Sequence, residues 1–342
     1  MKKLNVIFII LLLFGFSQIH SQSNYLISSK ISLEGDGGWD YLTVDEESGR
    51  LFVSHGTVVQ VVDLRQDKLI GTIKDLKGVH GIAIATEFNK GFITNGRDTS
   101  VTVFDLNDYS VIARITVTGA NPDAILYDAF SKKVFVFNGR SSNATVLDAG
   151  TNKVLETIPL DGKPEFCVSD GKGKVYVNIE DKSEISMINS FTMKVEKTWS
   201  ISPGEEPSGL AIDKSNSRLF SVCGNKLLVV TDAENGKIIT TLPIGDGVDG
   251  VAFDPVLNRI YSSNGEGNMT VIQEENANSF NVLETVSTQR GARTIAVDSK
   301  SNLVYLPCAE FGETPEKTSE NPHPRPPIKP GTFTILEVKP VK

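Results

Sequence analysis

The sequence contains little cysteine and little histidine. Its 342 residues include three cysteines and four histidines, and no C-x-x-C or C-x-x-C-H motif occurs. The sequence therefore gives no support for thioredoxin-like redox chemistry or for covalent c-type haem. It also lacks a nucleophile motif, a phosphate-binding loop and a cofactor fingerprint. We expect Cys167, Cys223 and Cys308 to be small buried side chains.

Basic residues are outnumbered by acidic ones. Lys and Arg total 34 against 42 for Asp and Glu, which gives a formal net charge of −8. Proteins that bind duplex DNA or anionic membranes need basic surface. We therefore expect neither duplex DNA nor a membrane surface as a partner.

The N-terminus carries an apolar run that is too short to span a bilayer as a helix. This run covers residues 4–16, follows Lys2 and Lys3, and precedes a short polar stretch that ends near Ser21. The pattern predicts a signal peptide over residues 1–21 and a mature domain over residues 22–342. The protein would then be periplasmic or secreted, with no membrane insertion after cleavage. An uncleaved anchor is the alternative interpretation.

The organising feature of the mature chain is a repeat. Short apolar segments end at a mark that is usually Asp, and successive marks are 40 to 44 residues apart. The marks are Asp45, Ala85, Asp128, Asp170, Asp213, Asp254 and Asp298. A period of this length is typical of propellers and other repeat architectures.

Each repeat contains the pattern of four short strands. Examples are a first strand at 209–213, a second at 50–53, a third at 100–105 and a fourth at 238–242. Second strands end in Asn-Gly pairs, which are strong hairpin signals, and β-branched residues dominate with no long helical period. The sequence therefore predicts an all-β, seven-bladed β-propeller, with a large β-sandwich as the weaker alternative.

The two ends of the chain predict how the ring closes. The seventh repeat ends with its third strand at 332–337 and lacks a fourth, whereas an unassigned strand pattern occupies residues 25–33. Pairing these segments would complete the last blade and remove exposed strand edges. A closed ring has no edge that requires a partner, so we expect a monomer.

Second strands at 91–95, 175–178 and 51–55 look like variants of the tetrapeptide that names the YVTN-repeat propellers. The following segments at 102–105 and 145–148 fit the same pattern. The mature chain therefore resembles the exported YncE-like members of the YVTN-repeat family. The resemblance implies the propeller fold. It does not fix an activity, because such propellers include binding proteins, lactonases, lyases and haem-binding domains.

Strand direction places one residue per blade at the channel mouth, on the face that also carries the blade-to-blade connections. We call this face the top face. The mouth residues are Asp40, His80, Asp123, Glu165, Ser208, Asp249 and Arg293. Ionisable side chains around one concavity favour a ligand, a metal or a buried ion network. A solvated rim without a function is the alternative.

An outer set of polar residues is predicted on the same face. Its members include His55, Arg97, Arg140, Glu180 and Glu310. Trp39, Glu206 and Arg290 are predicted as neighbours of the mouth residues. Arg97 and Arg140 occupy matching places in adjacent blades, where two guanidinium groups can clamp a carboxylate or a phosphate. Surface pairing with Asp98 and Asp123 is the alternative.

A metal would find hard oxygen ligands at the mouth. Asp40, Asp123, Glu165 and Asp249 suit Ca²⁺ or Mg²⁺, and His80 suits a softer ion such as Zn²⁺. His80 is also the candidate general base, oriented by a carboxylate. A hydrogen-bonded rim histidine is the alternative.

One segment of the last repeat departs from the pattern. Residues 309–330 contain six prolines where other repeats have a short turn. This composition favours stiff extended backbone, and the strand order places the segment on the top face. We expect a lid or a pocket wall, with an insertion of no function as the alternative.

Three functions are compatible with these features. The first is a propeller that binds a small polar or anionic ligand, or a partner segment, at the mouth. The second is a metal-dependent hydrolase or lyase resembling the propeller lactonases. The third is single-stranded nucleic-acid binding, which requires a basic groove with exposed aromatics and is disfavoured by the acidic composition.

Overall fold

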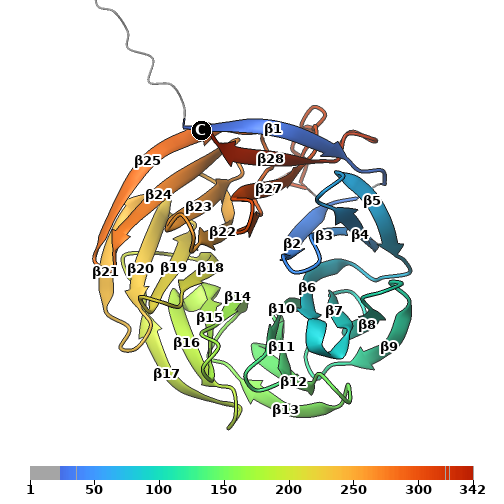
Figure 1. Ribbon diagram of the computed structural model, residues 1–342, viewed down its shortest axis with the longest axis vertical. Helices are drawn as coiled ribbons and strands as arrows, with labels where there is room; N and C mark the ends of the chain where they lie inside the picture. The colour runs from blue at the N-terminus through green and yellow to red at the C-terminus, as the bar shows by residue number, and fades with distance from the viewer. Residues whose placement is uncertain (1–23, 36, 320, 323, 342) are drawn as a thin grey trace, which may run out of the picture.

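The computed structural model describes residues 24–35, 37–319, 321–322 and 324–341. These residues form seven four-stranded antiparallel sheets arranged in a ring, which confirms the predicted seven-bladed propeller (Figure 1). The predicted signal peptide lies outside the described residues. Within them, no helix combines the length and the apolarity that a membrane crossing requires.

Six blades are each built from four consecutive strands, and the innermost strand comes first. Blade 1 contains β2 (Trp39–Asp45), β3 (Arg50–His55), β4 (Val58–Asp63) and β5 (Lys68–Ile73). Blade 2 contains β6 (Val79–Ala85), β7 (Lys90–Asn95), β8 (Ser100–Asp105) and β9 (Val111–Thr116). Blade 3 contains β10 (Pro122–Asp128), β11 (Lys133–Asn138), β12 (Asn143–Asp148) and β13 (Val154–Pro159).

The next three blades follow the same order. Blade 4 contains β14 (Pro164–Ser169), β15 (Lys174–Ile179), β16 (Glu184–Asn189) and β17 (Lys194–Ser200). Blade 5 contains β18 (Pro207–Asp213), β19 (Arg218–Cys223), β20 (Leu227–Asp232) and β21 (Ile238–Pro243). Blade 6 contains β22 (Val248–Asp254), β23 (Arg259–Asn264), β24 (Asn268–Asn276) and β25 (Ser279–Ser287). Two single 3₁₀ turns, η1 (Thr86–Phe88) and η2 (Glu180–Lys182), interrupt the loops.

Blade 7 joins the two ends of the chain, as the sequence predicts. It contains β26 (Ala296–Asp298), β27 (Leu303–Cys308), β28 (Thr334–Pro340) and, as its outer strand, β1 (Tyr25–Ser32). In the β1–β28 ladder, buried Ile31 lies opposite buried Ile335. The Tyr25 hydroxyl lies 3.0 Å from that of Tyr261 in blade 6, so the closing strand is also tied to the neighbouring blade.

The hydrophobic core lies between adjacent blades. Phe52 of blade 1 and Phe104 of blade 2 are fully buried, with ring centroids 5.8 Å apart. Burying one such ring stabilises the fold by roughly 1.5–3 kcal/mol. Near the axis the inner strands approach closely, because a Cβ atom at Gly81 would lie only 2.9 Å from the carbonyl oxygen of Asp123. This packing fixes the spacing of the mouth residues.

The Asn-Gly pairs were expected in tight turns, but their asparagines are buried residues at the ends of the second strands. Asn95 ends β7, but β8 begins only at Ser100, and Asn95 is fully buried. Its Nδ2 donates to Oγ1 of Thr102, 2.9 Å away, so the asparagine links the second strand to the third. The same bond recurs at Asn138–Thr145 (3.0 Å) and Asn264–Thr270 (3.0 Å). Arg97 therefore follows directly after a buried asparagine and a half-buried glycine.

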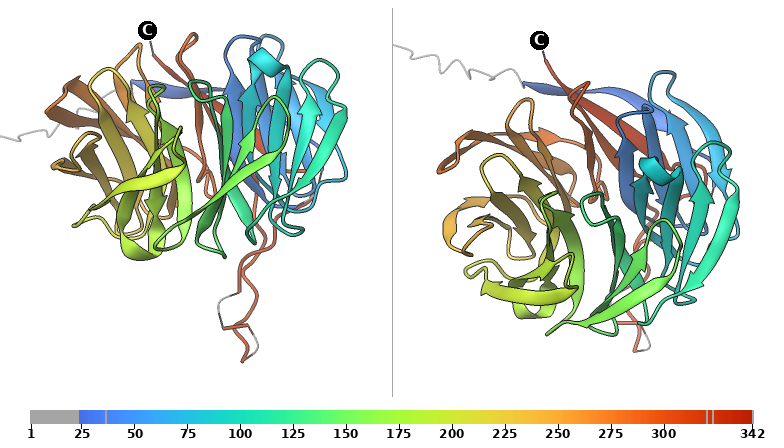
Figure 2. Two further views of the ribbon diagram at one scale, coloured as in Figure 1. Left: turned by 90° about the horizontal axis from the view of Figure 1, so that it is seen from below. Right: turned by 60° about the horizontal axis from the view of Figure 1, so that its bottom comes forward.

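We call residues 309–330, which connect β27 to β28, the arm. The arm projects from one face of the ring (the red segment in Figure 2). At its base Phe311 and Ile328 form an antiparallel bridge, and the amide of Gly312 donates to the carbonyl of Pro327 at 2.8 Å. The base of the arm is therefore a short two-stranded ladder.

Candidate functional site

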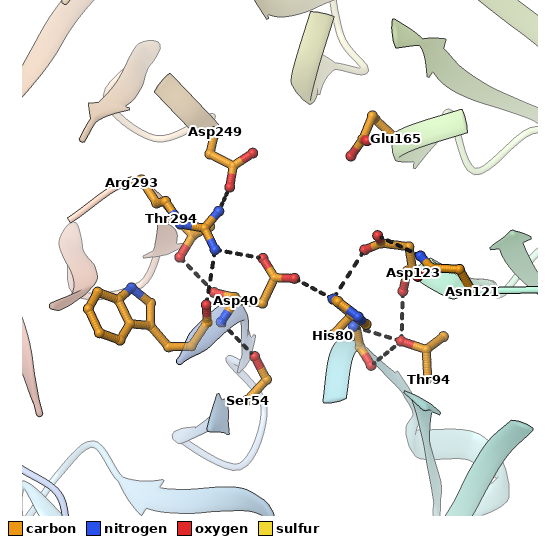
Figure 3. Close-up of polar contacts among 12 residues, drawn as sticks. Asp40, Ser54, His80, Thr94, Asn121, Asp123, Glu165, Asp249, Arg293 and Thr294 are labelled. Carbon is orange, nitrogen blue, oxygen red and sulfur yellow. Dashed lines mark hydrogen bonds and ion pairs between the residues drawn. The ribbon is translucent and has the colours of Figure 1, made fainter. Parts of the chain in front are cut away.

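The inner strands carry the predicted mouth residues at their second positions. Figure 3 shows six of these side chains, drawn from separate blades, around a common centre. They are Asp40 (β2), His80 (β6), Asp123 (β10), Glu165 (β14), Asp249 (β22) and Arg293, which precedes β26. Ser208 occupies the same position in β18.

Hydroxyl groups from the preceding blade hold the backbone of some mouth residues. Thr94 Oγ1 of blade 2 donates to the carbonyl of Asp123 in blade 3, at 2.7 Å. Ser263 Oγ of blade 6 donates to the carbonyl of Arg293 at 2.5 Å. These hydroxyls are buried, so the bonds fix the positions from which the charged side chains project.

Three mouth residues from adjacent blades meet at one point. Nδ1 of His80 lies 2.6 Å from Oδ2 of Asp40 and 3.6 Å from Oδ1 of Asp123. One ligand atom from each residue can be chosen so that all three lie within 4.8 Å of one another. The three side chains are 17–28% exposed. This arrangement can hold a proton on the imidazole or a divalent cation in its place.

Gly96, in the turn that follows β7, packs against the His80 ring and orients it. A Cβ atom at Gly96 would lie 2.6 Å from Nε2 and 2.8 Å from Cδ2 of His80. The Nε2 edge therefore packs on backbone, and Nδ1 is the nitrogen that faces the two carboxylates.

The surroundings of His80 and Asp123 shift the pKa values of both side chains. Burial lowers the pKa of His80, but the hydrogen bond to Asp40 and the charge of Asp123 outweigh it, so the pKa is raised. Burial raises the pKa of Asp123 to about 6, against the opposing effect of the His80 charge. Protonated His80 between two carboxylates is therefore favoured near neutral pH.

The other two predicted metal ligands are engaged elsewhere. Asp249 forms an ion pair with Arg293, whose Nη2 also lies 3.6 Å from Oδ1 of Asp40. Glu165 pairs with Lys163 at 2.5 Å. Of the four carboxylates predicted to bind a metal, the structure brings together Asp40 and Asp123, with His80 as the third group.

Lys163 joins a mouth residue to an outer one, because it pairs with both Glu165 and Glu180. Burial and the charge of Asp123 raise the pKa of Glu165 to about 7, although Lys163 acts in the opposite direction. Glu180 is therefore part of the mouth network through a lysine that the sequence interpretation did not single out.

His55 does not lie at the mouth. It is 1% exposed, and its ring stacks on Phe333 with centroids 4.0 Å apart. Its Nδ1 lies 3.1 Å from Oε1 of Gln60, which in turn donates to the carbonyl of Glu34. The side chain is a packed residue of blade 1, because the position that ends a second strand points into the core.

The remaining candidate residues are surface side chains. Arg97 and Arg140 are exposed, and among the described residues neither forms an ion pair, including the alternative pairing with Asp98 or Asp123. Glu206 is exposed beside Gly224. Glu310 lies at the base of the arm, 3.1 Å from Lys329.

Two aromatic side chains of inner strands, Tyr41 of β2 and Phe166 of β14, pack together next to the mouth residues Asp40 and Glu165 in sequence. Tyr41 and Phe166 lie with ring centroids 5.2 Å apart, beside a residual cavity of about 30 Å³. Such a cavity has room for about one water molecule. This cavity is therefore too small for a larger ligand.

A pocket of about 510 Å³ opens where the arm meets the mouth. We call it the arm pocket. It is lined by Gly37, Gly38, Trp39, Gly265, Arg290, Gly291, Arg293, Phe311, Arg325, Pro326 and Ile328. Three of these residues are arginines, and none carries a carboxylate. Among the described residues, Arg290 and Arg325 form no ion pair, whereas Arg293 is paired with acidic mouth residues.

The sequence interpretation identified part of this pocket. Arg293 is a predicted mouth residue, Trp39 and Arg290 are predicted neighbours of the mouth, and the arm was expected as a lid or a pocket wall. Phe311 and Arg325 were not singled out, because the arm lies outside the repeat and its internal register has no sequence signature. The sequence signal for this part of the pocket is the proline-rich composition of residues 309–330.

The fold and the site define an all-β propeller with a charged mouth and an arginine-lined pocket at its edge. The chain is similar in structure to hydrazine synthase from Kuenenia stuttgartiensis, with a TM-score of 0.70 and 17% sequence identity, over 80% of this chain and 94% of that one. At this identity the likeness shows the propeller fold alone. No family model matches the chain, and the search of curated proteins found no match.

Proposed function

We propose that this protein is a binding propeller that holds a small anionic ligand in the arm pocket, beside the channel mouth. The observation that carries the proposal is a pocket of about 510 Å³ lined by Arg290, Arg293 and Arg325 and by no acidic residue. Pockets of roughly 300–1,000 Å³ are typical of small-molecule sites.

The charge distribution supports an anion. The chain as a whole has a formal net charge of −8. A pocket lined by three arginines and no carboxylate therefore has the opposite sign of charge to the chain as a whole. Arg290 and Arg325 are exposed and are not neutralised by a carboxylate partner among the described residues. Guanidinium groups bind carboxylate and phosphate oxygens through two parallel hydrogen bonds, which gives both affinity and orientation.

Calorimetric titration at low ionic strength tests the proposal. Phosphate, malonate and benzoate are titrated into the protein, with malonamide and benzamide as neutral counterparts. We expect at least one anion to bind and the neutral amides not to bind. The double variant Arg290→Gln/Arg325→Gln should weaken binding at least tenfold, because a hydrogen bond to a charged group contributes roughly 1.5–3 kcal/mol.

The matched control is Arg97→Gln/Arg140→Gln, which removes two exposed arginines elsewhere on the surface. It should leave the affinity within twofold of the wild type. Loss of binding in this control, with binding retained in the Arg290/Arg325 variant, would assign the site to the outer residues instead. Absence of binding for every anion contradicts the proposal.

A second candidate function is favoured by one specific observation. Asp40, His80 and Asp123 converge on one point with two carboxylates and an imidazole, a ligand set that suits Zn²⁺ or Mn²⁺. On this alternative the protein is a metal-dependent hydrolase or lyase. A bound ion would act as a Lewis acid, and Arg293 beside Asp40 would orient that carboxylate.

Metal titration separates the two functions. Stoichiometric Zn²⁺ or Mn²⁺ binding that is lost in Asp123→Asn, together with metal-dependent hydrolysis of a lactone, supports the enzyme. Glu165→Gln is the control, since Glu165 is paired with Lys163 outside the group. Failure to bind either ion, with anion binding retained, supports the binding protein.

We also propose that the protein acts as an exported monomer, in the periplasm or outside the cell. The support is the signal-like sequence of residues 1–21 and the closed ring. Cell fractionation and light scattering test these points. A filter-binding assay at low salt tests the single-stranded nucleic-acid alternative, which retention of an oligonucleotide would favour.

A further inference from the structure

The arm pocket has an aromatic wall, which binding of a simple anion does not require. Trp39 of β2 and Phe311 of the arm line the same pocket, with ring centroids 6.1 Å apart and an interplanar angle of 45°. Ile328, the bridge partner of Phe311, lines it as well. The pocket therefore offers apolar surface next to its arginines.

This wall is preformed. The Phe311–Ile328 bridge is flanked by two backbone hydrogen bonds of 2.8 Å, from Gly312 to Pro327 and from Lys329 to Glu310. Phe311 and Ile328 also pack against the core cluster that contains Trp39 and Phe333. A wall fixed in this way loses little conformational entropy when a ligand packs against it.

Trp39 carries a polar group with no hydrogen-bond partner in the part of the chain that the structure describes. The residue is 8% exposed, and its buried Nε1 has no hydrogen-bond acceptor. Leaving a buried donor unsatisfied costs roughly 1–3 kcal/mol. Because this nitrogen is buried, a ligand in the pocket contacts the indole ring and not its N–H group.

The charged and the aromatic parts of the pocket are adjacent. The guanidinium carbon of Arg290 lies 5.8 Å from the ring centroid of Phe311. Arg325 comes from the arm segment that also supplies Ile328. A ligand that contacts the aromatic wall therefore has arginine side chains within reach of a directly attached anionic group.

We propose that the arm pocket takes an aromatic anion of the aryl carboxylate class, with its ring against Trp39 and Phe311 and its carboxylate on Arg290 and Arg325. The inference rests on the proposed function and specifies the ligand class of that same pocket. Arg293 is occupied by Asp249 and Asp40, so the carboxylate is assigned to the two arginines without ion-pair partners.

Matched ligands test the inference by calorimetry. 2-Naphthoate and benzoate carry the aromatic ring, whereas acetate, malonate and phosphate carry only the anionic group. We expect 2-naphthoate to bind at least tenfold more tightly than acetate, malonate or phosphate. Comparable affinity of 2-naphthoate and malonate overturns the aromatic inference and leaves the proposed function intact. If no anion binds, the proposed function fails as well.

Three variants locate the binding. Phe311→Ala should reduce 2-naphthoate affinity at least tenfold and leave malonate affinity within twofold, with Phe311→Leu as a less disruptive second variant. Trp39→Phe removes the buried N–H group but keeps an aromatic ring in the wall, so we expect 2-naphthoate affinity within about threefold of the wild type. Phe130→Ala is the control, because Phe130 is an exposed aromatic residue of another blade. Unchanged 2-naphthoate affinity in both Phe311 variants overturns the inference.

A spectroscopic readout is independent of the heat signal. The chain has two tryptophans, so Trp199→Phe leaves Trp39 as the reporter. Trp199 lies in β17 of blade 4 and packs on Tyr176. Benzoate should change Trp39 emission with the same dissociation constant that calorimetry gives. Saturable binding with no change in Trp39 emission contradicts binding at the aromatic wall.

Discussion

Gly96 and His80 are so close that a Cβ atom at position 96 would lie 2.6 Å from Nε2 of the imidazole. The two residues belong to one blade: His80 is the second residue of the inner strand β6, and Gly96 follows the second strand β7. The contact holds the Nδ1 edge of His80 toward Asp40 and Asp123.

Gly96→Ala should therefore displace His80 from the carboxylates. We expect the pKa of His80 to fall toward its ordinary value of 6.5, because the hydrogen bond to Asp40 that raises it would be lost. NMR titration of the imidazole measures this change, with His80→Gln used to assign the signal. Gly139→Ala is the matched control in blade 3, where the nearest neighbouring atom would be 3.6 Å away. An unchanged His80 pKa in Gly96→Ala would contradict the orienting role of the glycine.

Gly291 has a comparable role at the arm pocket. Its φ is +88°, and a Cβ atom there would lie 2.7 Å from Cε2 of Phe311. Gly291→Ala should push Phe311 out of the wall and weaken 2-naphthoate binding at least fivefold. Gly331→Ala is the control, because Gly331 also has a positive φ, +71°, but has open space around its Cβ position. Equal ligand affinities of the two variants would show that the Phe311 contact is unimportant for binding.

Closure of the ring by β1 predicts a position-dependent effect within one strand. Ile31 is 4% exposed and lies opposite Ile335, whereas Leu26 is 40% exposed. Ile31→Asp should lower the free energy of unfolding by roughly 3 kcal/mol or more, since it buries an unpaired charge. Leu26→Asp should change it by less than about 1 kcal/mol. Chemical denaturation measures both, and similar stabilities would argue against closure by this strand.

Glu274 predicts a pH dependence of stability. It is 3% exposed, and burial together with the charge of Asp213 raises its pKa from 4.5 to about 7. Between these values the folded state keeps a proton that the unfolded state has lost, so this residue makes stability fall as pH rises from about 4.5 to 7. Glu274→Gln should remove that part of the slope and be more stable than the wild type at pH 8.

The exposed neighbour Glu275 provides the control for this titration. Glu275→Gln should leave the pH profile of unfolding unchanged. A Glu274→Gln variant with the same slope as the wild type would show that the buried carboxyl is not the source of the pH dependence.

The sequence predicted the ring because every repeat carries the same local signals. The marks from Asp45 to Asp298, the alternating strands and the separated fourth strand at 25–33 are enough to assign seven blades and their closure. The position of the mouth residues follows from strand direction alone. These are properties of the repeat, and they do not depend on individual side-chain contacts.

The contacts within the site could not be predicted in the same way. His55 was expected on the rim, but the last residue of a second strand points into the core and stacks on Phe333. Asn95 was expected in a tight turn, but its amide is needed for a buried bond to Thr102. Lys163 forms ion pairs with both Glu165 and Glu180, and no spacing pattern in the sequence predicts these contacts.

The arm pocket is the part of the site that depends most on three-dimensional packing. The composition of residues 309–330 marked the arm as irregular. The composition does not predict that Phe311 packs beside Trp39, because these residues come from opposite ends of the chain. The ring closure that brings blade 7 next to blade 1 is what makes this contact.

Anomalous X-ray scattering from crystals soaked in 4-iodobenzoate tests the binding site most directly. The account predicts an iodine peak in the arm pocket, against Trp39 and Phe311, with the carboxylate density on Arg290 and Arg325. That peak should disappear in Arg290→Gln/Arg325→Gln crystals soaked in the same way. Iodine peaks confined to other surfaces, or a pocket peak that persists in the arginine variant, would contradict it.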